Sequence, residues 1–112
     1  SGPDLELSAK SALAFSMSLH ELSTNAVKYG ALSNEVGHVE LTWTLEGEGE
    51  DRTLDFRWGE FGGPPVNLPS RTGFGSRLMK GLARDMGGIG ELKYEPSGVV
   101  WTLRAKLRQI AA

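Results

Sequence analysis

The spacing of apolar residues changes along this chain, and that change limits the folds open to it. Between Ser8 and Gly30 they recur at intervals of three and four, as on one face of an amphipathic helix. They are Ala12, Phe15, Leu19, Leu22, Ala26 and Tyr29. Ser8 is a typical helix N-cap and Gly30 a typical helix stop. From residue 39 the interval falls to two, which is typical of a half-buried strand, and the apolar residues there are Val39, Leu41, Trp43 and Leu45. The chain must therefore pack helix against sheet.

The next segment continues this alternation. After the acidic turn EGEGED, the residues Leu54, Phe56 and Trp58 alternate with polar ones, so a second strand returns antiparallel to the first. Residues 59–75, with the sequence GEFGGPPVNLPSRTGFG, show no periodicity and are rich in Gly and Pro. They are predicted to form a long loop, and loops of this length are often functional.

The last third of the chain repeats the pattern of one helix and two strands. A second helix is predicted over residues 76–86, and its apolar face consists of Leu78, Met79, Leu82 and Met86. The segment ELKYE and the alternating residues 99–107 predict a second hairpin. The segment DLEL before the first helix is a candidate for one more strand. This order predicts an α/β (α+β) two-layer sandwich, with a mixed, largely antiparallel sheet and helices on one face.

Composition narrows the possible functions. The chain has 112 residues, of which 39% are hydrophobic, so residues 1–112 are predicted to be a single domain with one core. A net charge of -2 gives no reason to expect nucleic acid or an anionic membrane as a partner. Cysteine is absent, which excludes disulfides and thiolate metal sites. The apolar stretches are too short to cross a bilayer, so a soluble domain without membrane contact is expected.

The first predicted helix carries a polar stripe. Glu21, Asn25 and Lys28 follow one another at helical spacing, and Tyr29 lies where this stripe meets the apolar face. The amide oxygen of Asn25 suits Mg²⁺, which prefers oxygen ligands and shares them with substrate phosphates. The carboxylate of Glu21 could orient a water, and the ammonium of Lys28 could neutralise phosphate charge. The alternative is an ordinary solvated helix face with polar pairs. His20 points about 100° away from Glu21 and is not predicted to bind a metal.

Glu60 continues the inward phase of the second strand, after Trp58. If that strand runs through Gly59, a carboxylate points toward the core and needs a hydrogen-bond donor, which an adenine amine could supply. If the strand ends at Gly59, Glu60 lies in water. The tryptophans occupy inward strand phases and are expected to pack in the core; they are Trp43, Trp58 and Trp101.

Glycines bracket the long loop. Gly62 and Gly63 begin it, and Gly73 and Gly75 precede the second helix, where backbone N–H groups and the helix N-terminus could meet phosphate oxygens. Taken alone this signal is weak, because turns also need glycine. Two loop residues, Arg71 and Thr72, could reach a phosphate. The basic stripe of the second helix, which consists of Arg77, Lys80 and Arg84, is expected to be a solvated face.

In this order the motifs resemble the catalytic ATP-binding domain of histidine kinases, whose Bergerat-type fold is shared with gyrase-type ATPases. The resemblance is closest to the HWE subfamily, which is named for a His in its first motif and a Trp-x-Glu in its second. Here His20 lies in HELSTNAVKYGALS, and Trp58 and Glu60 lie in WGEFGGPPV. The third motif is GFGSRLMKGLARDMGG. The resemblance covers nearly the whole chain.

The resemblance implies a role for each candidate residue. Asn25 would ligate Mg²⁺, Glu21 would orient a water or polarise the site, and Lys28 and Tyr29 would contact ATP. Glu60 would take the place of the aspartate that binds the adenine amine in other histidine kinases. The residues assigned to ATP binding beyond these are Gly62, Gly63, Arg71, Thr72, Gly73 and Gly75, with a short ATP lid between Gly63 and Gly73. The usual Asp-x-Gly-x-Gly motif is replaced here by the sequence EFGGP.

The resemblance also implies partners. A histidine kinase transfers the γ-phosphoryl group of ATP to a histidine on a helical dimerisation domain, and from there to an aspartate of a response regulator. No room for the helical domain exists before Ser8, so we expect a catalytic domain that cannot autophosphorylate by itself and that belongs to a cytoplasmic part of a bacterial signalling protein. Two alternatives remain open. One is an ATPase or serine kinase of the same fold, as in anti-sigma regulators, and the other is a pseudokinase that serves as an interaction module.

Overall fold

The structure is a computed structural model that describes residues 2–3, 5–63, 74–95 and 98–111. Its elements follow the predicted order of helix, two strands, helix and two strands, with short helical turns added. In chain order they are α1 (Ala9–Tyr29), η1 (Ala31–Ser33), β1 (His38–Glu46), η2 (Gly49–Asp51), β2 (Thr53–Phe61), α2 (Phe74–Asp85), β3 (Ile89–Glu95), β4 (Gly98–Lys106) and α3 (Leu107–Ile110).

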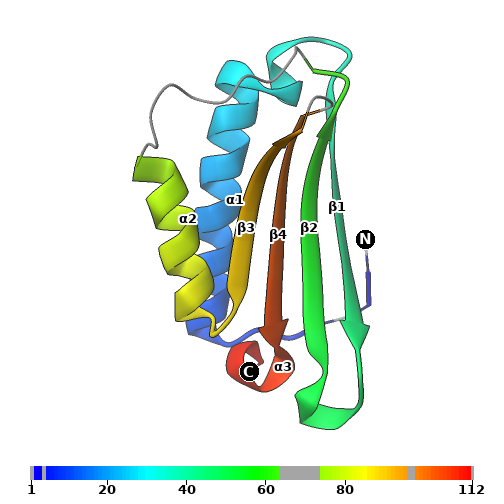
Figure 1. Ribbon diagram of the computed structural model, residues 1–112, viewed down its shortest axis with the longest axis vertical. Helices are drawn as coiled ribbons and strands as arrows, with labels where there is room; N and C mark the ends of the chain where they lie inside the picture. The colour runs from blue at the N-terminus through cyan, green and yellow to red at the C-terminus, as the bar shows by residue number, and fades with distance from the viewer. Residues whose placement is uncertain (1, 4, 64–73, 96–97, 112) are drawn as a thin grey trace.

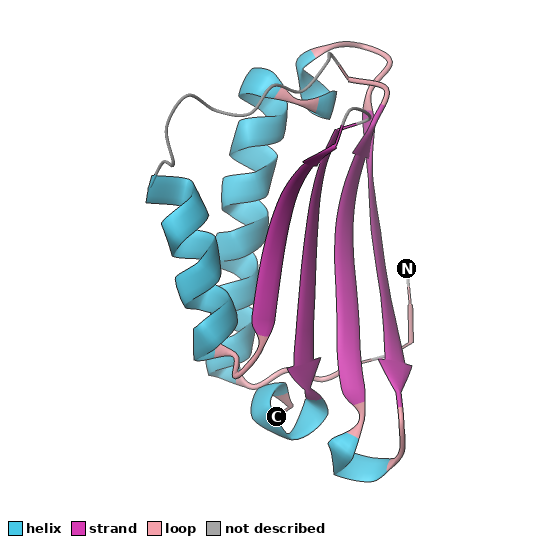
Figure 2. Cartoon of the chain, in the orientation of Figure 1, coloured by secondary structure: helices cyan, strands magenta, loops and turns pink. Residues whose placement is uncertain are grey.

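The strands form one four-stranded sheet in the order β1-β2-β4-β3 (Figure 2). Each neighbouring pair is antiparallel. The two predicted hairpins are confirmed, and they join along their inner strands, where Trp58 of β2 lies opposite Trp101 of β4. The sheet is therefore wholly antiparallel among the described residues, within the α+β class that the sequence predicts.

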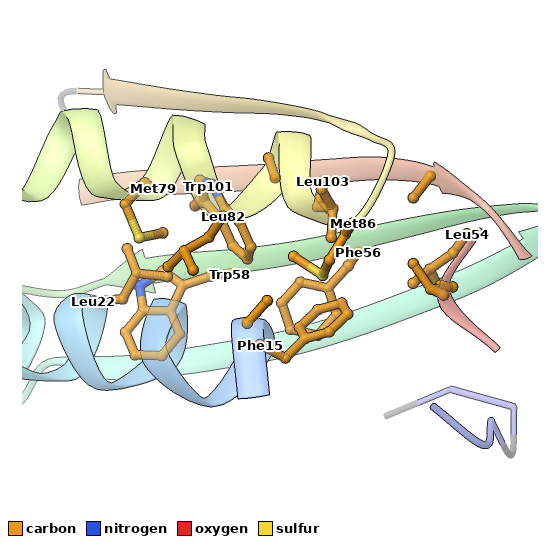
Figure 3. Packing of buried hydrophobic residues seen from close by; sticks show 14 of the residues in the cluster. Phe15, Leu22, Leu54, Phe56, Trp58, Met79, Leu82, Met86, Trp101 and Leu103 are labelled. Carbon is orange, nitrogen blue, oxygen red and sulfur yellow. The ribbon is translucent and has the colours of Figure 1, made fainter. Parts of the chain in front are cut away.

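Both long helices cover the same face of this sheet (Figure 1). The core lies between the two layers and is rich in aromatic rings (Figure 3). Phe56 of β2 is central to it, because its ring makes edge contacts with Phe15 of α1 at 5.2 Å and with Trp101 of β4 at 5.8 Å between centroids. Aromatic pairs of this geometry stabilise a core beyond the area that they bury. All three tryptophans pack in this core or against it, as predicted, although Trp43 on the edge strand β1 is only partly buried.

The ends of α1 match the prediction, whereas one residue of its buried face does not. Ser8 caps the helix by accepting a hydrogen bond from the N–H of Ser11 at 3.2 Å. Ala12 is exposed, and Ser11 is buried in its place. Ser18 is also buried, because its hydroxyl donates to the carbonyl oxygen of Ala14 within the helix at 2.9 Å. Serine does not count as apolar in the helical pattern, so the observed buried face of α1 is turned slightly from the predicted one.

The predicted loop was too long at both ends. Strand β2 continues to Phe61, since Gly59 still pairs with Glu40 and Val100 in the sheet, and α2 begins at Phe74. The final strand ends at Lys106, and the short helix α3 follows it, which alternation did not predict. The segment DLEL does not form a strand in its described residues. Leu7 makes only an isolated bridge with Ala111.

Within the described part of the chain, no helix has the combination of length and apolar character that crossing a membrane requires.

Candidate functional site

Three segments meet beyond the C-terminal end of α1. They are the turn that begins with Gly30 and Ala31, the loop that leads into β1, and the end of β2. Their backbones approach closely, because a Cβ atom on Gly63 would lie only 2.6 Å from the Cα of Ala31. A glycine is needed where two backbones come this near.

Glu60 is the buried charged residue at this junction. Its exposed fraction is 2%, and it follows Trp58 on the inward face of β2, which is one of the two alternatives that the sequence left open. One carboxylate oxygen, Oε1, accepts the backbone N–H of Ala31 at 3.0 Å. The other, Oε2, accepts the indole N–H of Trp58 at 3.0 Å. The chain therefore supplies a donor to each oxygen, which a buried carboxylate requires.

Two glycines allow the chain to close around Glu60. A Cβ atom on Gly30 would overlap with Oε1 of Glu60, and a Cβ atom on Gly98 would overlap with the backbone carbonyl oxygen of Glu60. Gly30 therefore permits the side-chain contact, and Gly98 permits the first residue of β4 to pack against the end of β2. The sequence prediction did not assign either glycine to the site.

The polar stripe of α1 runs toward this junction. The side-chain amide nitrogen of Asn25 lies 3.4 Å from Oε1 of Glu21, one helical turn earlier. Glu21 is half-buried, whereas Asn25 and Lys28 are exposed. Tyr29 is the last residue of α1, and its side chain lies outside what the structure describes. Helix α1, which carries this stripe, ends beside Glu60, because a Cβ atom on Gly30 would overlap with Oε1 of Glu60.

This stripe has the chemistry that a magnesium nucleotide needs. The amide nitrogen of Asn25 donates a hydrogen bond to the carboxylate of Glu21. The amide oxygen of Asn25 is therefore the atom that can face a cation. A neutral amide oxygen is a suitable ligand for Mg²⁺, which takes its remaining ligands from water and phosphate. Lys28 lies one turn further along and could face the phosphate charge.

Asn34 organises the loop between α1 and β1. Its side-chain oxygen accepts the N–H of Gly37 at 2.7 Å and that of Val36 at 3.2 Å. Its amide nitrogen lies 3.4 Å from the carbonyl oxygen of Gly62. Gly62 has a φ of 73°, in the left-handed region that favours glycine. Asn34 therefore links this loop to the first glycine after Glu60, a link that the sequence did not indicate.

Several predicted residues fall outside the described part of the chain. Arg71, Thr72 and Gly73 do so, together with the predicted lid between Gly63 and Gly73. Gly75 lies in the first turn of α2. Farther along α2, Lys80 and Arg84 are exposed as predicted, and the side chain of Arg77 is not described. His20 is exposed on α1.

Sequence reasoning missed two donors, Trp58 and Ala31. The indole N–H of Trp58 had a visible signal, because residues two apart on one strand share a face. The N–H of Ala31 had none, since it is a backbone group 29 residues from Glu60 in the chain. Only the fold brings it to the carboxylate.

Comparisons with known proteins support the family resemblance. No protein-family model matches the chain. It is 46% identical over 102 residues to a blue-light-activated histidine kinase of Brucella anthropi, an alignment that covers 89% of this chain and 21% of the relative. It is 41% identical over 101 residues to the protein of the same name from Brucella ovis, with 89% and 21% covered. The chain thus spans about a fifth of the length of these relatives.

Solved structures share the fold. The blue-light activated histidine kinase of Erythrobacter litoralis superposes with a TM-score of 0.72 at 17% identity, over 96% of this chain and 34% of that one. A structure of the histidine kinase domain of that protein gives a TM-score of 0.67 at 15% identity, over 96% and 51%. The chain is therefore similar in sequence to one part of these histidine kinases, and it shares the fold of a solved histidine kinase domain.

Proposed function

We propose that this domain binds ATP with Mg²⁺ and transfers the γ-phosphoryl group to a histidine on a separate helical dimerisation domain of the same protein. A response regulator would then receive the phosphoryl group on an aspartate. The observation that carries the proposal is that Glu21 and Asn25, joined at 3.4 Å, lie on the helix whose C-terminal end meets the buried carboxylate of Glu60. An oxygen ligand for a cation and an acceptor for a base thus lie at one end of α1.

The roles follow from the chemistry of each group. Asn25 would hold Mg²⁺, and the ion would supply charge neutralisation between the phosphates when it is bound. Glu21 would orient Asn25 and a water, while Lys28 and Tyr29 would contact the nucleotide. Glu60 would accept the exocyclic amine of adenine. In phosphoryl transfer a protein acts mainly by positioning groups and by neutralising charge, and these residues are suited to both.

The remaining loop residues belong to the same proposal. Gly62 and Gly63 would form the start of a lid over the nucleotide, and Gly73 and Gly75 its end. Arg71 and Thr72 would reach the phosphates. The domain would work in the cytoplasm, where ATP and response regulators are found, without contact to nucleic acid or membrane.

Calorimetry with a non-hydrolysable ATP analogue tests the binding step. The unaltered chain is expected to bind the analogue more tightly with Mg²⁺ than with a chelator present. Asn25→Ala is expected to remove this Mg²⁺-dependent gain while the melting temperature stays unchanged. Ser16→Ala is the matched control, because Ser16 is exposed on α1 about 180° around the helix from Asn25. An Asn25→Ala variant that retains the full Mg²⁺ effect would falsify the metal role.

A labelling experiment tests the transfer step. The chain is mixed with γ-labelled ATP, Mg²⁺ and the part of a Brucella relative outside the matched fifth, in which the proposal places the helical domain. Acid-labile label on that helical domain is expected, and it should disappear when the acceptor histidine is replaced. Release of free phosphate by the chain in the absence of the helical domain would instead identify an ATPase of the same fold.

A further inference from the structure

We infer that Trp58 is a positioning residue for base recognition, because its indole N–H fixes the orientation of the carboxylate of Glu60. The inference rests on the proposed function, since it assumes that Glu60 accepts the amine of adenine. It adds a residue that the proposed function does not use. Trp58 would have no contact with the nucleotide and would act through Glu60 alone.

The first step is that the indole group is itself held in place. Trp58 is 4% exposed, and its ring lies in the core near Leu22 of α1 and Met79 of α2 (Figure 3). Protein interiors are closely packed, so a large ring in this position has little freedom to turn. The nitrogen of the indole therefore stays at a fixed place, 3.0 Å from Oε2 of Glu60.

The second step concerns what the carboxylate can still accept. A carboxylate has two oxygens with about four acceptor sites. Ala31 occupies one site on Oε1, and Trp58 occupies one on Oε2. Acceptor sites remain on both oxygens, so the carboxylate keeps the capacity for a further donor beyond its two present partners. Because each oxygen is held by its own donor, rotation of the carboxylate about its terminal bond would break both hydrogen bonds.

The third step is selectivity. Adenine presents an amine where guanine presents a carbonyl oxygen. A fixed carboxylate accepts from the amine and repels the carbonyl, and a binding site that is built for a donor rejects a ligand that lacks it. A carboxylate that can rotate loses part of this discrimination, because it can turn away from the carbonyl oxygen of guanine. The Trp58 hydrogen bond is therefore expected to increase the preference for adenine over guanine.

Trp58→Phe is the informative substitution, since it keeps an aromatic ring in the core and removes the N–H donor; the part of the indole that is lost with it is matched by the control below. Affinities for non-hydrolysable ATP and GTP analogues are measured by calorimetry with Mg²⁺ present. The unaltered chain is expected to prefer the ATP analogue, and Trp58→Phe is expected to reduce that preference roughly fivefold, which corresponds to the loss of one ordinary hydrogen bond. In a Glu60→Gln background, Trp58→Phe is expected to change the preference no further.

Trp43→Phe is the matched control. It also removes an indole hydrogen bond, which Trp43 donates to the carbonyl oxygen of Pro3 at 2.7 Å, but on the edge strand β1. The preference for the ATP analogue is expected to stay unchanged. An equal change in Trp43→Phe and Trp58→Phe would overturn the inference, since any loss of core packing would then explain both.

The remaining outcomes separate the inference from the proposed function. If the unaltered chain binds neither analogue, the proposed function fails and the inference fails with it. If the unaltered chain prefers the ATP analogue and Trp58→Phe keeps that preference in full, only the inference fails.

A second measurement does not depend on the folding of Trp58→Phe. The chain has three tryptophans, so the indole N–H signals of the ¹⁵N-labelled protein can be assigned with Trp43→Phe and Trp101→Phe. The Trp58 signal is expected to shift when the ATP analogue is added, and to shift less with the GTP analogue. A Trp58 signal that does not respond to a bound ATP analogue would overturn the inference.

Discussion

The backbone N–H of Ala31 donates a hydrogen bond to Oε1 of Glu60 at 3.0 Å, and this bond fixes the end of α1 against the end of β2. The two residues are 29 positions apart in the chain. The bond therefore couples the helix that carries Glu21 and Asn25 to the strand that carries Trp58.

Gly30→Ala tests this coupling. The added Cβ would overlap with Oε1 of Glu60 and lie 3.1 Å from the Cα of Ala26. Because the carboxylate is held by two donors, it cannot move aside without losing one of them. We expect the free energy of unfolding to fall by about 1–3 kcal/mol, as for other overpacked positions. Urea denaturation followed by circular dichroism measures it.

Gly81→Ala is the matched control for that substitution. Gly81 lies inside α2, and among the described residues nothing outside the backbone of that helix would be within 4 Å of its added Cβ. Alanine favours a helix interior more than glycine, so the free energy of unfolding is expected to rise by about 0.5–1 kcal/mol. If both variants lose stability alike, the contact between Gly30 and Glu60 is not the cause.

Glu60→Gln is expected to destabilise the fold even without nucleotide. Glutamine places an NH₂ group where one carboxylate oxygen was, and that group would face the N–H of Ala31 or of Trp58, so one buried donor loses its acceptor. The expected loss in the free energy of unfolding is about 1–3 kcal/mol. Glu46→Gln, at an exposed end of β1, should change it by less than about 0.5 kcal/mol. Equal stability of the two variants would contradict the assigned hydrogen bonds.

Phe56→Ala tests the aromatic centre of the core. The substitution removes the ring contacts with Phe15, Trp43 and Trp101 and leaves a cavity. Losses of about 3–5 kcal/mol are typical of such changes. Ile89→Ala, at a residue that is 78% exposed, should shift the free energy of unfolding by less than about 0.5 kcal/mol. Thermal and urea unfolding of both variants would show whether Phe56 has the central role that its contacts indicate.

The partial burial of Tyr94 leads us to expect that the free energy of unfolding falls at alkaline pH. Burial raises the pKa of its phenol above the ordinary value of 10.0, so folding favours the protonated form. The stabilisation is complete below the pKa of the unfolded chain and is lost as the pH rises through the higher pKa of the folded chain. Stability should therefore decline above about pH 10 more steeply in the unaltered chain than in Tyr94→Phe. Urea denaturation between pH 8 and pH 11 gives both profiles, and parallel profiles would contradict the prediction.

Much of the fold could be predicted from the sequence, because local periodicity encodes it. The alternation that ends at Trp58 left two alternatives for Glu60, and the structure shows the one in which β2 runs through Gly59 and the carboxylate faces inward. The buried face of α1 was predicted only in part. Ser11 and Ser18 are polar by type, but they are buried because their hydroxyl groups form hydrogen bonds with nearby residues of the same segment. The pairing of β2 with β4 joins segments far apart in sequence, and no local pattern specifies it.

The same difference between local patterns and distant contacts applies to the candidate site. Side chains on one helix face, such as Glu21 and Asn25, follow from helical spacing, and the structure pairs these two, as a solvated helix face with polar pairs would also do. Partners of Glu60 that come from elsewhere in the chain depend on how α1 meets the sheet. The link from Asn34 to Gly62, which spans 28 positions, is of the same kind.

Helix α1 is attached at both of its ends. At its start the N–H of Ser8 donates to the carbonyl oxygen of Ile110 at 2.8 Å, next to the bridge between Leu7 and Ala111. Its far end is tied through Ala31 to Glu60. Its 21 residues make a stiff rod about 30 Å long. A displacement of Ser8 against Ile110 at the start of this rod would therefore also displace Ala31 and the carboxylate of Glu60 at its far end.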